Sequence, residues 1–379
     1  MEELTQEEIT RYSRHIILPN VGMDGQKRLK NARVLIVGGG ALGSSSALYL
    51  AAAGVGNIGI VDFDRVDVTN LQRQIIHTND NVGKLKTQSA KEGIARLNPL
   101  VNVTVFNTKL TSDNALDIIK DFYIVVDCTD NFPARYLIND ACVLLDKPLV
   151  YGSIFRFDAY SSVFWAKKGA CYRCLFPSPP PPELTPSCGE GGVFGVLPGI
   201  IGSIQANEVI KLILGSNDTL VGRLLILDAW KMRFTQIKVQ KDENCPLCGK
   251  NPTIKKLIDY EDFCAVKIPE NGGFENIGAR ALKKKIDKGE KINIIDVREV
   301  FEFEMGHIKG SINIPLNSLI SRMSEIDESK ESVLLCKSGV RSVYAAHSLI
   351  KEGFKGKILN LQDGIIEWAL KIDKSLAEY

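Results

Sequence analysis

Two cysteine pairs with the same spacing give this sequence its strongest chemical signal. Cys171 stands with Cys174, and Cys245 with Cys248, with two residues between the cysteines of each pair. Pairs of this spacing are typical of a closed tetrahedral Zn²⁺ site made of four thiolates. Because the pairs are far apart in the sequence, we expect the metal to join two segments of one folded domain. Four protein ligands leave no open position for catalysis, so we expect a structural zinc, with a redox dithiol as the alternative.

Cys336 opens a second motif, C-K-S-G-V-R-S, which lies between an apolar run and a predicted helix. A thiol at this place is close to the backbone N–H groups of a loop and to a helix N-terminus, and Arg341 closes the loop. These features stabilise a negative sulfur. Four residues separate Cys336 from Arg341, a loop too short to surround a phosphate as in a phosphatase. The motif predicts a thiol that carries a persulfide sulfur, with a buried structural cysteine as the alternative.

Cys188 lies in a Pro/Gly-rich run, P-S-P-P-P-P-E-L-T-P-S-C-G-E-G-G, whose composition excludes regular structure and predicts a mobile loop. A lone loop cysteine is usually incidental. Over the edge of an α/β sheet, however, it could be an acyl acceptor or a thiol that relays sulfur. Both readings stay open at this point.

The stretch R-V-L-I-V-G-G-G-A-L-G indicates nucleotide binding. Val34 to Val37 is an apolar run typical of a buried strand, and Leu42 to Ala53 is an alanine-rich helical stretch. Three glycines stand at the junction in G-x-G-x-x-G spacing: Gly38, Gly40 and Gly43. Such glycines let the backbone approach a phosphate, and the helix N-terminus offers N–H groups to the anion. A second strand, Ile58 to Val61, ends at Asp62, where a ribose-binding acid is expected; a turn without a ligand is the alternative.

Polar side chains suited to a nucleotide are dense after that strand: Asp62, Asp64, Asn70, Arg73 and Gln74. A helix then opens near Gly83 with Lys84 and Lys86, which either neutralise phosphate charge or are solvated. Asp130 follows the strand Ile124 to Asp127, at the edge where open α/β sheets bind ligands. A carboxylate there could hold Mg²⁺ on a triphosphate. Alternatively, Asp130 or Asn131 caps the next helix.

Strands and helices alternate in both halves of the chain and must position these residues. In the first half we also expect strands Val101 to Phe106, Pro148 to Gly152, Ser162 to Trp165 and Leu224 to Leu227, and helices over 113–120 and 199–214. From Phe274 a second α/β unit begins, with strands Ile292 to Val297, Ser311 to Ile314 and Val333 to Leu335, a helix in each gap between them, and flanking helices over 279–287 and 342–352. Residues 1–32 are expected to be helical, with Arg11 and Arg14 on one face.

Length and composition limit the class of protein. At 379 residues the chain is long enough for two or three domains, and its 45% hydrophobic and 24% charged content is ordinary for a soluble globular protein. No apolar run approaches the roughly 20 residues that span a bilayer, so we expect no membrane segment. A net charge of +2 gives no case for direct nucleic-acid binding. Nine cysteines without a secretory signal favour a reducing compartment, which we expect to be the cytoplasm.

Together these motifs resemble two known families. Residues 8–250 resemble the MoeB/ThiF family of adenylyltransferases, relatives of ubiquitin-activating enzymes, through R-Y-S-R-H-I-I-L, V-G-G-G-A-L-G, D-F-D-x-V-x-x-T-N-L-Q-R-Q, V-G-K-x-K, D-C-T-D-N and both cysteine pairs. Residues 274–379 resemble a rhodanese domain through I-I-D-V-R-E-V-F-E-F-E-M-G-H-I-K-G-S-I-N-I-P and C-K-S-G-V-R-S. The resemblance implies a Rossmann-like α/β adenylation domain over 1–250 with a mostly parallel sheet and a zinc site, a linker over 251–272, and a smaller α/β rhodanese domain over 273–379.

The resemblance also implies roles in ATP binding. Asp62 would bind the ribose and Asp130 would bind Mg²⁺, whereas the triphosphate would be held by Asn70, Arg73 and Lys86. The full nucleotide site would comprise Gly38, Gly40, Ala41, Gly43, Asp62, Asp64, Thr69, Asn70, Leu71, Gln72, Arg73, Lys86, Asp130 and Asn131. Ala41 replaces a glycine common in the family, where only backbone contact is expected.

Other roles concern catalysis and assembly. Arg14 resembles an arginine that reaches the triphosphate bound by a partner subunit, which implies a homodimer. Cys188 stands where the family has a crossover-loop cysteine, and Cys336 where the rhodanese persulfide forms, with Arg341 beside it. Lys337 takes a place often held by arginine, which keeps the charge and could shift the choice of sulfur donor.

The reaction implied is ATP-dependent adenylation of the C-terminal Gly-Gly of a ubiquitin-like sulfur carrier protein. A persulfide on Cys336, loaded by a persulfide or thiosulfate donor, would then give a C-terminal thiocarboxylate. The pathway served stays open between molybdopterin synthesis, thiamine synthesis, tRNA thiolation and protein conjugation. Two other readings are a carrier-binding scaffold with an inactive nucleotide site and an NAD-dependent oxidoreductase.

Overall fold

The computed structural model describes residues 2–179, 192–264 and 273–376. Cys188 lies outside the described residues. The chain divides into two compact units. The first holds the described residues up to 264, and the second holds those from 273 onward.

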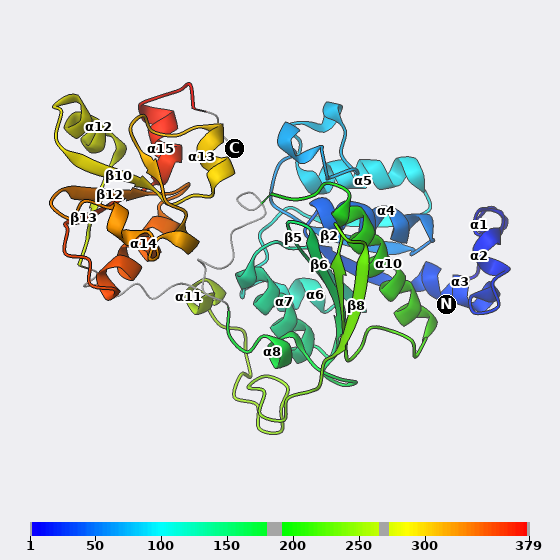
Figure 1. Cartoon of the computed structure of the whole chain (residues 1–379). Coiled ribbons are helices and arrows are strands. Elements are labelled where there is room, and N and C mark those ends of the chain that lie inside the picture. The colour runs from blue at the N-terminus through cyan, green and yellow to red at the C-terminus, as the bar shows by residue number, and fades with distance from the viewer. Residues whose placement is uncertain (1, 180–191, 265–272, 377–379) are drawn as a thin grey trace. The chain divides into compact units, whose positions relative to one another are not determined.

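The first unit is built on an eight-stranded sheet, in the order β3-β2-β1-β4-β5-β6-β7-β8 (Figure 1). Its strands are β1 (Arg33–Val37), β2 (Asn57–Val61), β3 (Asn102–Phe106), β4 (Ile124–Asp127), β5 (Leu149–Phe155), β6 (Asp158–Phe164), β7 (Arg223–Asp228) and β8 (Arg233–Lys238). The strands from β3 to β5 are parallel, whereas β6, β7 and β8 each run antiparallel to the strand before. The predicted α/β fold with a mostly parallel sheet is confirmed.

β1 lies at the switch point of this sheet, because the chain continues to β2 on one side and to β4 on the other. Ligands of open α/β sheets bind outside the carboxyl ends of the strands at such a point. The two strand ends are joined here, since the N–H of Cys128 donates to the carbonyl of Val37 at 2.9 Å. The glycine-rich loop and the D-C-T-D-N segment therefore meet at one place.

Helices cover both faces of this sheet. Val34 and Ile36 of β1 share a buried core with residues of α4, α5 and α10, whereas Leu35 and Val37 share another with residues of α6 and α7. The helices of the unit are α1 (Gln6–Arg11), α2 (Ser13–Ile16), α3 (Gly22–Asn31), α4 (Ala41–Ala52), α5 (Lys86–Leu97), α6 (Ala115–Ile119), α7 (Phe132–Leu144), α8 (Tyr172–Leu175), α10 (Leu197–Leu214) and α11 (Tyr260–Cys264). Successive residues of β1 thus pack into the cores on opposite faces of the sheet, as expected for a strand that helices cover on both sides.

In the described part of the chain, α10 is the one helix long and apolar enough to cross a membrane by length and composition. It packs against α4, α3, β5 and β6 of the same unit, and it carries the buried polar side chains Gln205 and Glu208. These contacts are those of a core helix of a folded domain.

The second unit is built on a five-stranded parallel sheet, in the order β11-β10-β12-β13-β9. Its elements are β9 (Glu275–Ile277), α12 (Ala279–Asp287), β10 (Ile292–Asp296), α13 (Val300–Met305), β11 (Ile312–Asn313), β12 (Glu331–Leu335), α14 (Val340–Lys351), β13 (Ile358–Leu361) and α15 (Gly364–Lys371). The helix predicted between the strands Ser311 to Ile314 and Val333 to Leu335 is wrong. Short 3-10 turns, Leu316–Ser318 and Met323–Glu325, take its place.

Candidate functional site

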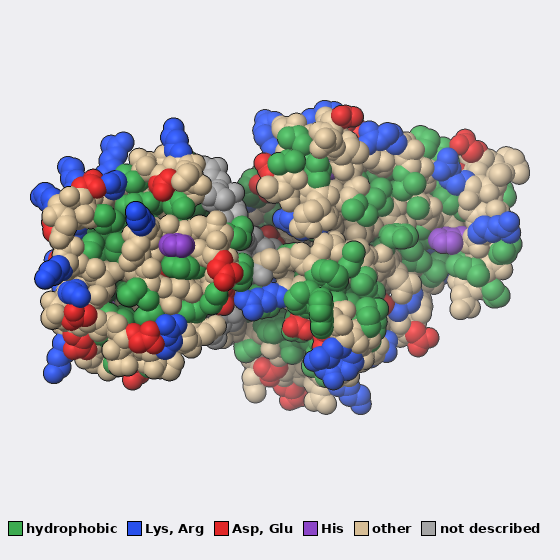
Figure 2. Space-filling view, turned by 45° about the horizontal axis from the view of Figure 1, so that its top comes forward, with side chains coloured by type: hydrophobic (Ala, Val, Ile, Leu, Met, Phe, Trp, Pro, Cys, Tyr) green, Lys and Arg blue, Asp and Glu red, His purple; other side chains and the backbone are tan. Residues whose placement is uncertain are grey.

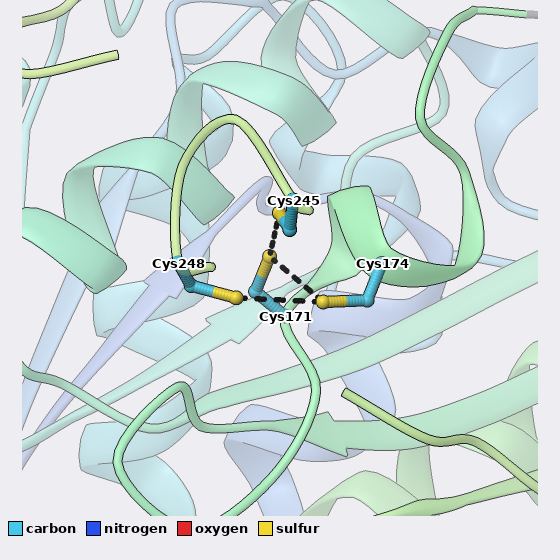
Figure 3. Close-up of side chains that lie close together, drawn as sticks. All are labelled: Cys171, Cys174, Cys245 and Cys248. Atoms are coloured by element: carbon cyan, nitrogen blue, oxygen red, sulfur yellow. Dashed lines mark hydrogen bonds between the residues drawn. The ribbon is translucent and has the colours of Figure 1, made fainter. Parts of the chain in front are cut away.

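Four cysteine sulfurs converge in the first unit, as the sequence predicted. The Sγ atoms of Cys171, Cys174, Cys245 and Cys248 all lie within 4.8 Å of one another (Figure 3). The first pair comes from the start of α8, and the second pair from the chain after β8. Four soft sulfur donors at these separations fit a tetrahedral zinc whose coordination is filled by the protein.

Arg173, between the first two cysteines, ties this cluster to other helices. Its Nε and Nη2 donate to the two carboxylate oxygens of Asp140, each at 2.8 Å, and both side chains are buried. The guanidinium lies over the rings of Tyr136 and Phe263, 4.8 and 4.6 Å from their centroids. Asp140 also accepts from the hydroxyl of Tyr260 at 2.8 Å. A paired buried charge thus joins α7, α8 and α11.

The glycine-rich loop turns tightly between β1 and α4. Gly38 has a φ of +100°, and a Cβ there would lie 2.7 Å from the carbonyl oxygen of Cys128. A Cβ on Gly43 would lie 2.0 Å from the carbonyl oxygen of Gly38. Neither position has room for a side chain. Gly40 is the N-cap of α4, so the unpaired N–H groups of the helix begin within this loop.

Asp62 holds the loop from the end of β2. Its Oδ2 accepts from the N–H of Gly39 at 2.7 Å, and its Oδ1 accepts from the N–H of Asp64 at 2.8 Å. Burial raises the pKa of Asp62, and the charge of Lys86 acts in the opposite direction. Lys86, the first residue of α5, is only 8% exposed, and its Nζ lies 2.7 Å from Oδ2 of Asp64. Two predicted carboxylates and the predicted lysine therefore gather beside the glycine-rich loop.

The segment from Thr69 to Arg73 forms a turn next along the chain. Oδ1 of Asn70 accepts from the N–H of Asp67 at 3.2 Å, and Nη1 of Arg73 donates to the carbonyl of Thr69 at 3.0 Å. Leu71 and Gln72 lie between Asn70 and Arg73. The backbone of Gln72 packs closely on Gly195, because a Cβ on Gly195 would lie 2.7 Å from the carbonyl oxygen of Gln72. In the described residues these hydrogen bonds stay within the turn rather than reaching the glycine-rich loop.

Two side chains after this turn do reach the loop. Gln74 is buried, and its Nε2 lies 3.6 Å from where a Cβ on Gly40 would be. His77 is also buried, with its Nε2 3.1 Å from the carbonyl oxygen of Gly39. Gln74 was predicted to lie near a nucleotide without a defined role, and His77 was not predicted. The sequence signal that was available is R-Q-I-I-H, in which His77 follows Gln74 by three residues.

Two roles were considered for Asp130 and Asn131, namely Mg²⁺ binding and capping of the next helix. Asn131 is the N-cap of α7, since its Oδ1 accepts from the N–H of Ala134 at 3.0 Å. Asp130 is exposed just beyond β4. The buried Asp127 holds this segment, because its Oδ1 accepts from the N–H of Thr129 at 2.9 Å. Asp130 is thus presented to solvent at the switch point.

Arg14 lies elsewhere in the unit, exposed on α2. Within the residues that the structure describes, it makes no hydrogen bond or ion pair with the gathered nucleotide residues. It is the one predicted triphosphate ligand on an N-terminal helix.

Cys336 lies at the end of β12 and is fully buried. Its Sγ accepts from the N–H of Gly339 at 3.2 Å and from the hydroxyl of Ser342 at 3.5 Å. Gly339 has a φ of +90°, and a Cβ there would lie 1.9 Å from the carbonyl oxygen of Gln362. The loop thus turns donors onto the sulfur, as the motif predicted.

Arg341 has a partner that the sequence did not indicate. Its Nη1 and Nη2 lie 2.7 and 2.8 Å from the two carboxylate oxygens of Glu302, which is fully buried on α13. Arg341 is the second residue of α14, directly after the loop, and Glu302 on α13 fixes its guanidinium from another helix.

Comparison with known proteins agrees with this arrangement of two units. The ThiF family matches residues 12–247, and the rhodanese-like domain matches residues 278–371. The chain is 46% identical to a probable adenylyltransferase/sulfurtransferase MoeZ of Mycobacterium tuberculosis, over 99% of this chain and 96% of the relative. It is 42% identical to the adenylyltransferase and sulfurtransferase MOCS3 of Culex quinquefasciatus, over 100% of this chain and 91% of the relative.

Two further proteins match part of the chain. A sulfur carrier protein adenylyltransferase of Thermus thermophilus is 50% identical over 69% of this chain and 99% of its own length. Among solved structures, MccB of Escherichia coli superposes with a TM-score of 0.57 at 23% identity, covering 63% of this chain and 75% of that one. The superposition with MccB shows that the two proteins share a fold.

These matches exclude the reading as an NAD-dependent oxidoreductase. The relatives named above are adenylyltransferases, and those that match over the whole chain are also sulfurtransferases. This chain therefore belongs to the ThiF family, in the group of adenylyltransferase and sulfurtransferase enzymes that carry a C-terminal rhodanese-like domain.

Proposed function

We propose that the chain activates the C-terminal Gly-Gly carboxylate of a ubiquitin-like sulfur carrier protein with ATP and converts it to a thiocarboxylate. The observation that carries this proposal is the presence of both half-sites in one chain. Asp62 and Lys86 gather at a glycine-rich loop, and Cys336 is cradled by donors. The printed name of the Thermus thermophilus relative, a sulfur carrier protein adenylyltransferase, supports this choice of substrate.

In the first step, an oxygen of the carrier carboxylate attacks the α-phosphorus of ATP. The bond to the β-phosphate breaks, and pyrophosphate leaves with the electron pair. The protein supplies position and charge: loop N–H groups and Lys86 face the phosphates, while Asp62 faces the ribose. Asn70 and Arg73 would hold the triphosphate after turning out of their local hydrogen bonds. The product is a carrier acyl-adenylate.

Asp130 is the proposed ligand of Mg²⁺. Its exposed carboxylate at the carboxyl end of β4 supports this role, because Mg²⁺ is held by one or two carboxylates together with substrate phosphates. The ion would neutralise charge on the triphosphate.

In the second step, sulfur moves from the second unit. The Cys336 thiolate attacks the outer sulfur of thiosulfate, sulfite leaves, and a persulfide forms. The terminal persulfide sulfur then attacks the acyl carbon of the adenylate and displaces AMP, which gives an acyl disulfide between Cys336 and the carrier. The N–H of Gly339 and the hydroxyl of Ser342 face the Sγ of Cys336 and stabilise the negative charge of its thiolate.

A second thiol must release the product, and Cys188 is the proposed one. Attack of its thiolate on the Cys336 sulfur frees the thiocarboxylate and leaves a disulfide, which a thiol reductant then reduces. An alternative order has Cys188 capture the carrier first as a thioester. Cys188 lies outside the described residues, so its part rests on the family motif.

The proposed assembly is a homodimer in which Arg14 completes the partner's nucleotide site. The exposed position of Arg14 on α2 supports this, as do the neighbouring side chains of Ile17 and Leu18, which are 67% and 49% exposed. Apolar residues this exposed beside a functional arginine are typical of an interface.

The proposed carrier surface is an aromatic cluster on the first unit. The ring of Phe157 lies 5.0 Å from that of Trp230 and 5.6 Å from that of Phe194, and all three are exposed. One face of the molecule also displays hydrophobic side chains gathered among charged ones on this unit (Figure 2). Aromatic residues are enriched in protein interfaces.

The test incubates the full chain with MgATP, thiosulfate and a panel of Gly-Gly carriers, then weighs each carrier by intact-mass spectrometry. We expect one terminal oxygen to be replaced by sulfur. Asp130→Asn should abolish ATP–pyrophosphate exchange and spare thiosulfate sulfurtransferase activity, and Cys336→Ser should do the reverse. Loss of exchange in Cys336→Ser would contradict the division of labour, and no exchange with any carrier would favour the scaffold reading.

A further inference from the structure

His77 contacts the backbone of the glycine-rich loop at Gly39. Its ring is 5% exposed. Nε2 lies 3.1 Å from the carbonyl oxygen of Gly39, and Nδ1 lies 2.8 Å from Oγ of Ser89 on α5. The ring is therefore held at both nitrogens, between the loop and the helix that begins with Lys86.

These contacts select one form of the ring. A carbonyl oxygen only accepts hydrogen bonds, so Nε2 must carry a hydrogen. Burial lowers the pKa of His77, the hydrogen bond to Gly39 opposes this shift, and the charge of Lys86 adds to it. The net lowering favours the neutral ring at pH 7. Nδ1 is then an acceptor, and the hydroxyl of Ser89 is its donor. Ser89 thus keeps the hydrogen on the nitrogen that faces Gly39.

The bond to Gly39 fixes a peptide plane. The carbonyl of Gly39 and the N–H of Gly40 belong to one planar trans peptide, so they point in opposite directions. Because the carbonyl of Gly39 is held toward His77, the N–H of Gly40 points away from His77. Asp62 holds the preceding peptide in the same way, through the N–H of Gly39. Glycine offers no side chain to resist a peptide flip, so these outside contacts must do so.

We propose that His77 is a positioning residue for the adenylation step, which locks the Gly39–Gly40 peptide so that its N–H faces the phosphates of ATP. A flipped peptide would present a carbonyl oxygen to the anion instead. The proposal rests on the ATP site proposed above.

The test compares two substitutions of nearly equal size. Gln places an amide nitrogen where Nε2 of His lies, whereas Asn places one near Nδ1 and does not reach Gly39. Binding of a non-hydrolysable ATP analogue with Mg²⁺ is measured by calorimetry on the full chain. We expect His77→Asn to weaken binding about tenfold, and His77→Gln to stay within about twofold of the wild type. In ATP–pyrophosphate exchange, the Asn variant should raise KM for ATP more than it lowers kcat.

Controls separate this role from a structural one. Thiosulfate sulfurtransferase activity should be equal in all variants, since Cys336 lies in the other unit. Nitrogen-15 NMR of the wild-type chain should show His77 with its hydrogen on Nε2 at pH 7, a reading that needs no variant to fold. Equal affinity of the Asn and Gln variants, or a hydrogen on Nδ1, would overturn the positioning role alone. A wild-type chain that binds no ATP analogue would overturn the proposed function and this inference together.

Discussion

Glu302 is a fully buried carboxylate that forms an ion pair with Arg341. The two guanidinium bonds are 2.7 and 2.8 Å long, and Oε2 also accepts from the N–H of Glu299 at 2.9 Å. Removing one partner of a buried pair leaves the other charge uncompensated and costs about 3–5 kcal/mol. Because Arg341 ends the loop of Cys336, we expect the geometry around the sulfur to depend on Glu302.

We expect Glu302→Gln to lower thiosulfate sulfurtransferase activity at least about tenfold and to destabilise the second unit by about 3 kcal/mol. Enzyme assay and urea unfolding measure the two effects. Glu304→Gln is the matched control, because Glu304 is exposed on the same helix. ATP–pyrophosphate exchange should not change in either variant. Equal sulfurtransferase activity in the Glu302→Gln and Glu304→Gln variants would contradict the positioning of Arg341 by Glu302.

The pKa of His77 gives a prediction about pH. Burial lowers this pKa below the usual value of 6.5, so below about pH 6.5 the unfolded chain binds a proton that the folded chain does not. Stability therefore falls as the pH falls through this window. Between about pH 7.5 and pH 5.5, the wild type should lose more free energy of unfolding than His77→Gln, in which this proton is absent. The other histidines are common to both proteins, so equal losses would refute the prediction.

Motif residues were predictable, whereas their partners were not. The four zinc-site cysteines, Asp62, Lys86 and Cys336 each stand in a spacing that chemistry requires. Asp140, Glu302 and His77 act through contacts between elements, and Glu302 is 39 residues from Arg341. No local pattern marks such a partner, because the fold alone brings it close.

At the scale of elements, α11 is held to the first unit by contacts near the cysteine cluster. It packs on α7, and its Tyr260 donates to Asp140 at 2.8 Å. Phe263 stacks edge to face on Tyr136, with centroids 5.2 Å apart. This helix lies within the predicted linker over 251–272, whose limits as a domain boundary stay a prediction.

Tyr260→Phe removes one hydrogen bond and leaves the pair of Asp140 and Arg173 intact. We expect the hydrogen bond to contribute about 1 kcal/mol, so its loss should mainly increase local opening of α11 from the first unit. Limited proteolysis should cleave the variant faster around residues 257–264, as mapped by mass spectrometry. Tyr123→Phe is the control, because Tyr123 is 58% exposed. Unchanged cleavage would mean that the hydroxyl does not anchor the helix.

Most of the buried apolar strands were predicted, whereas β8, β9 and β13 were missed. β1, β2 and β4 are buried along nearly their whole length, so the sequence marks them strongly. β8 is exposed at every residue on the edge of the sheet, so burial placed no constraint on its sequence. The two 3-10 turns that replace the predicted helix in the second unit are each only three residues long. Composition alone did not distinguish such short turns from a helix.

At the scale of the whole molecule, the cysteine cluster should make the stability of the first unit depend on zinc. Metal analysis should find one zinc per chain. Removal by a chelator should lower the unfolding temperature of the first unit by on the order of 10 °C and leave that of the second unchanged, as seen by calorimetry. Cys248→Ser should lose the metal. Cys264→Ser should keep it, because Cys264 lies outside the cluster. A shift of both transitions would contradict a zinc that serves the first unit alone.

The anchoring of α11 has a kinetic consequence. Because the described chain belongs to the first unit up to Cys264, the covalent tether to the unit of Cys336 is counted from Cys264 to Gly273 rather than from residue 250. A thiol on a short tether meets its target at an effective concentration in the millimolar range, which falls with about the −3/2 power of tether length. In the reaction proposed above, the persulfide on Cys336 would therefore need little binding affinity of its own for the adenylate, because the chain itself brings the two together.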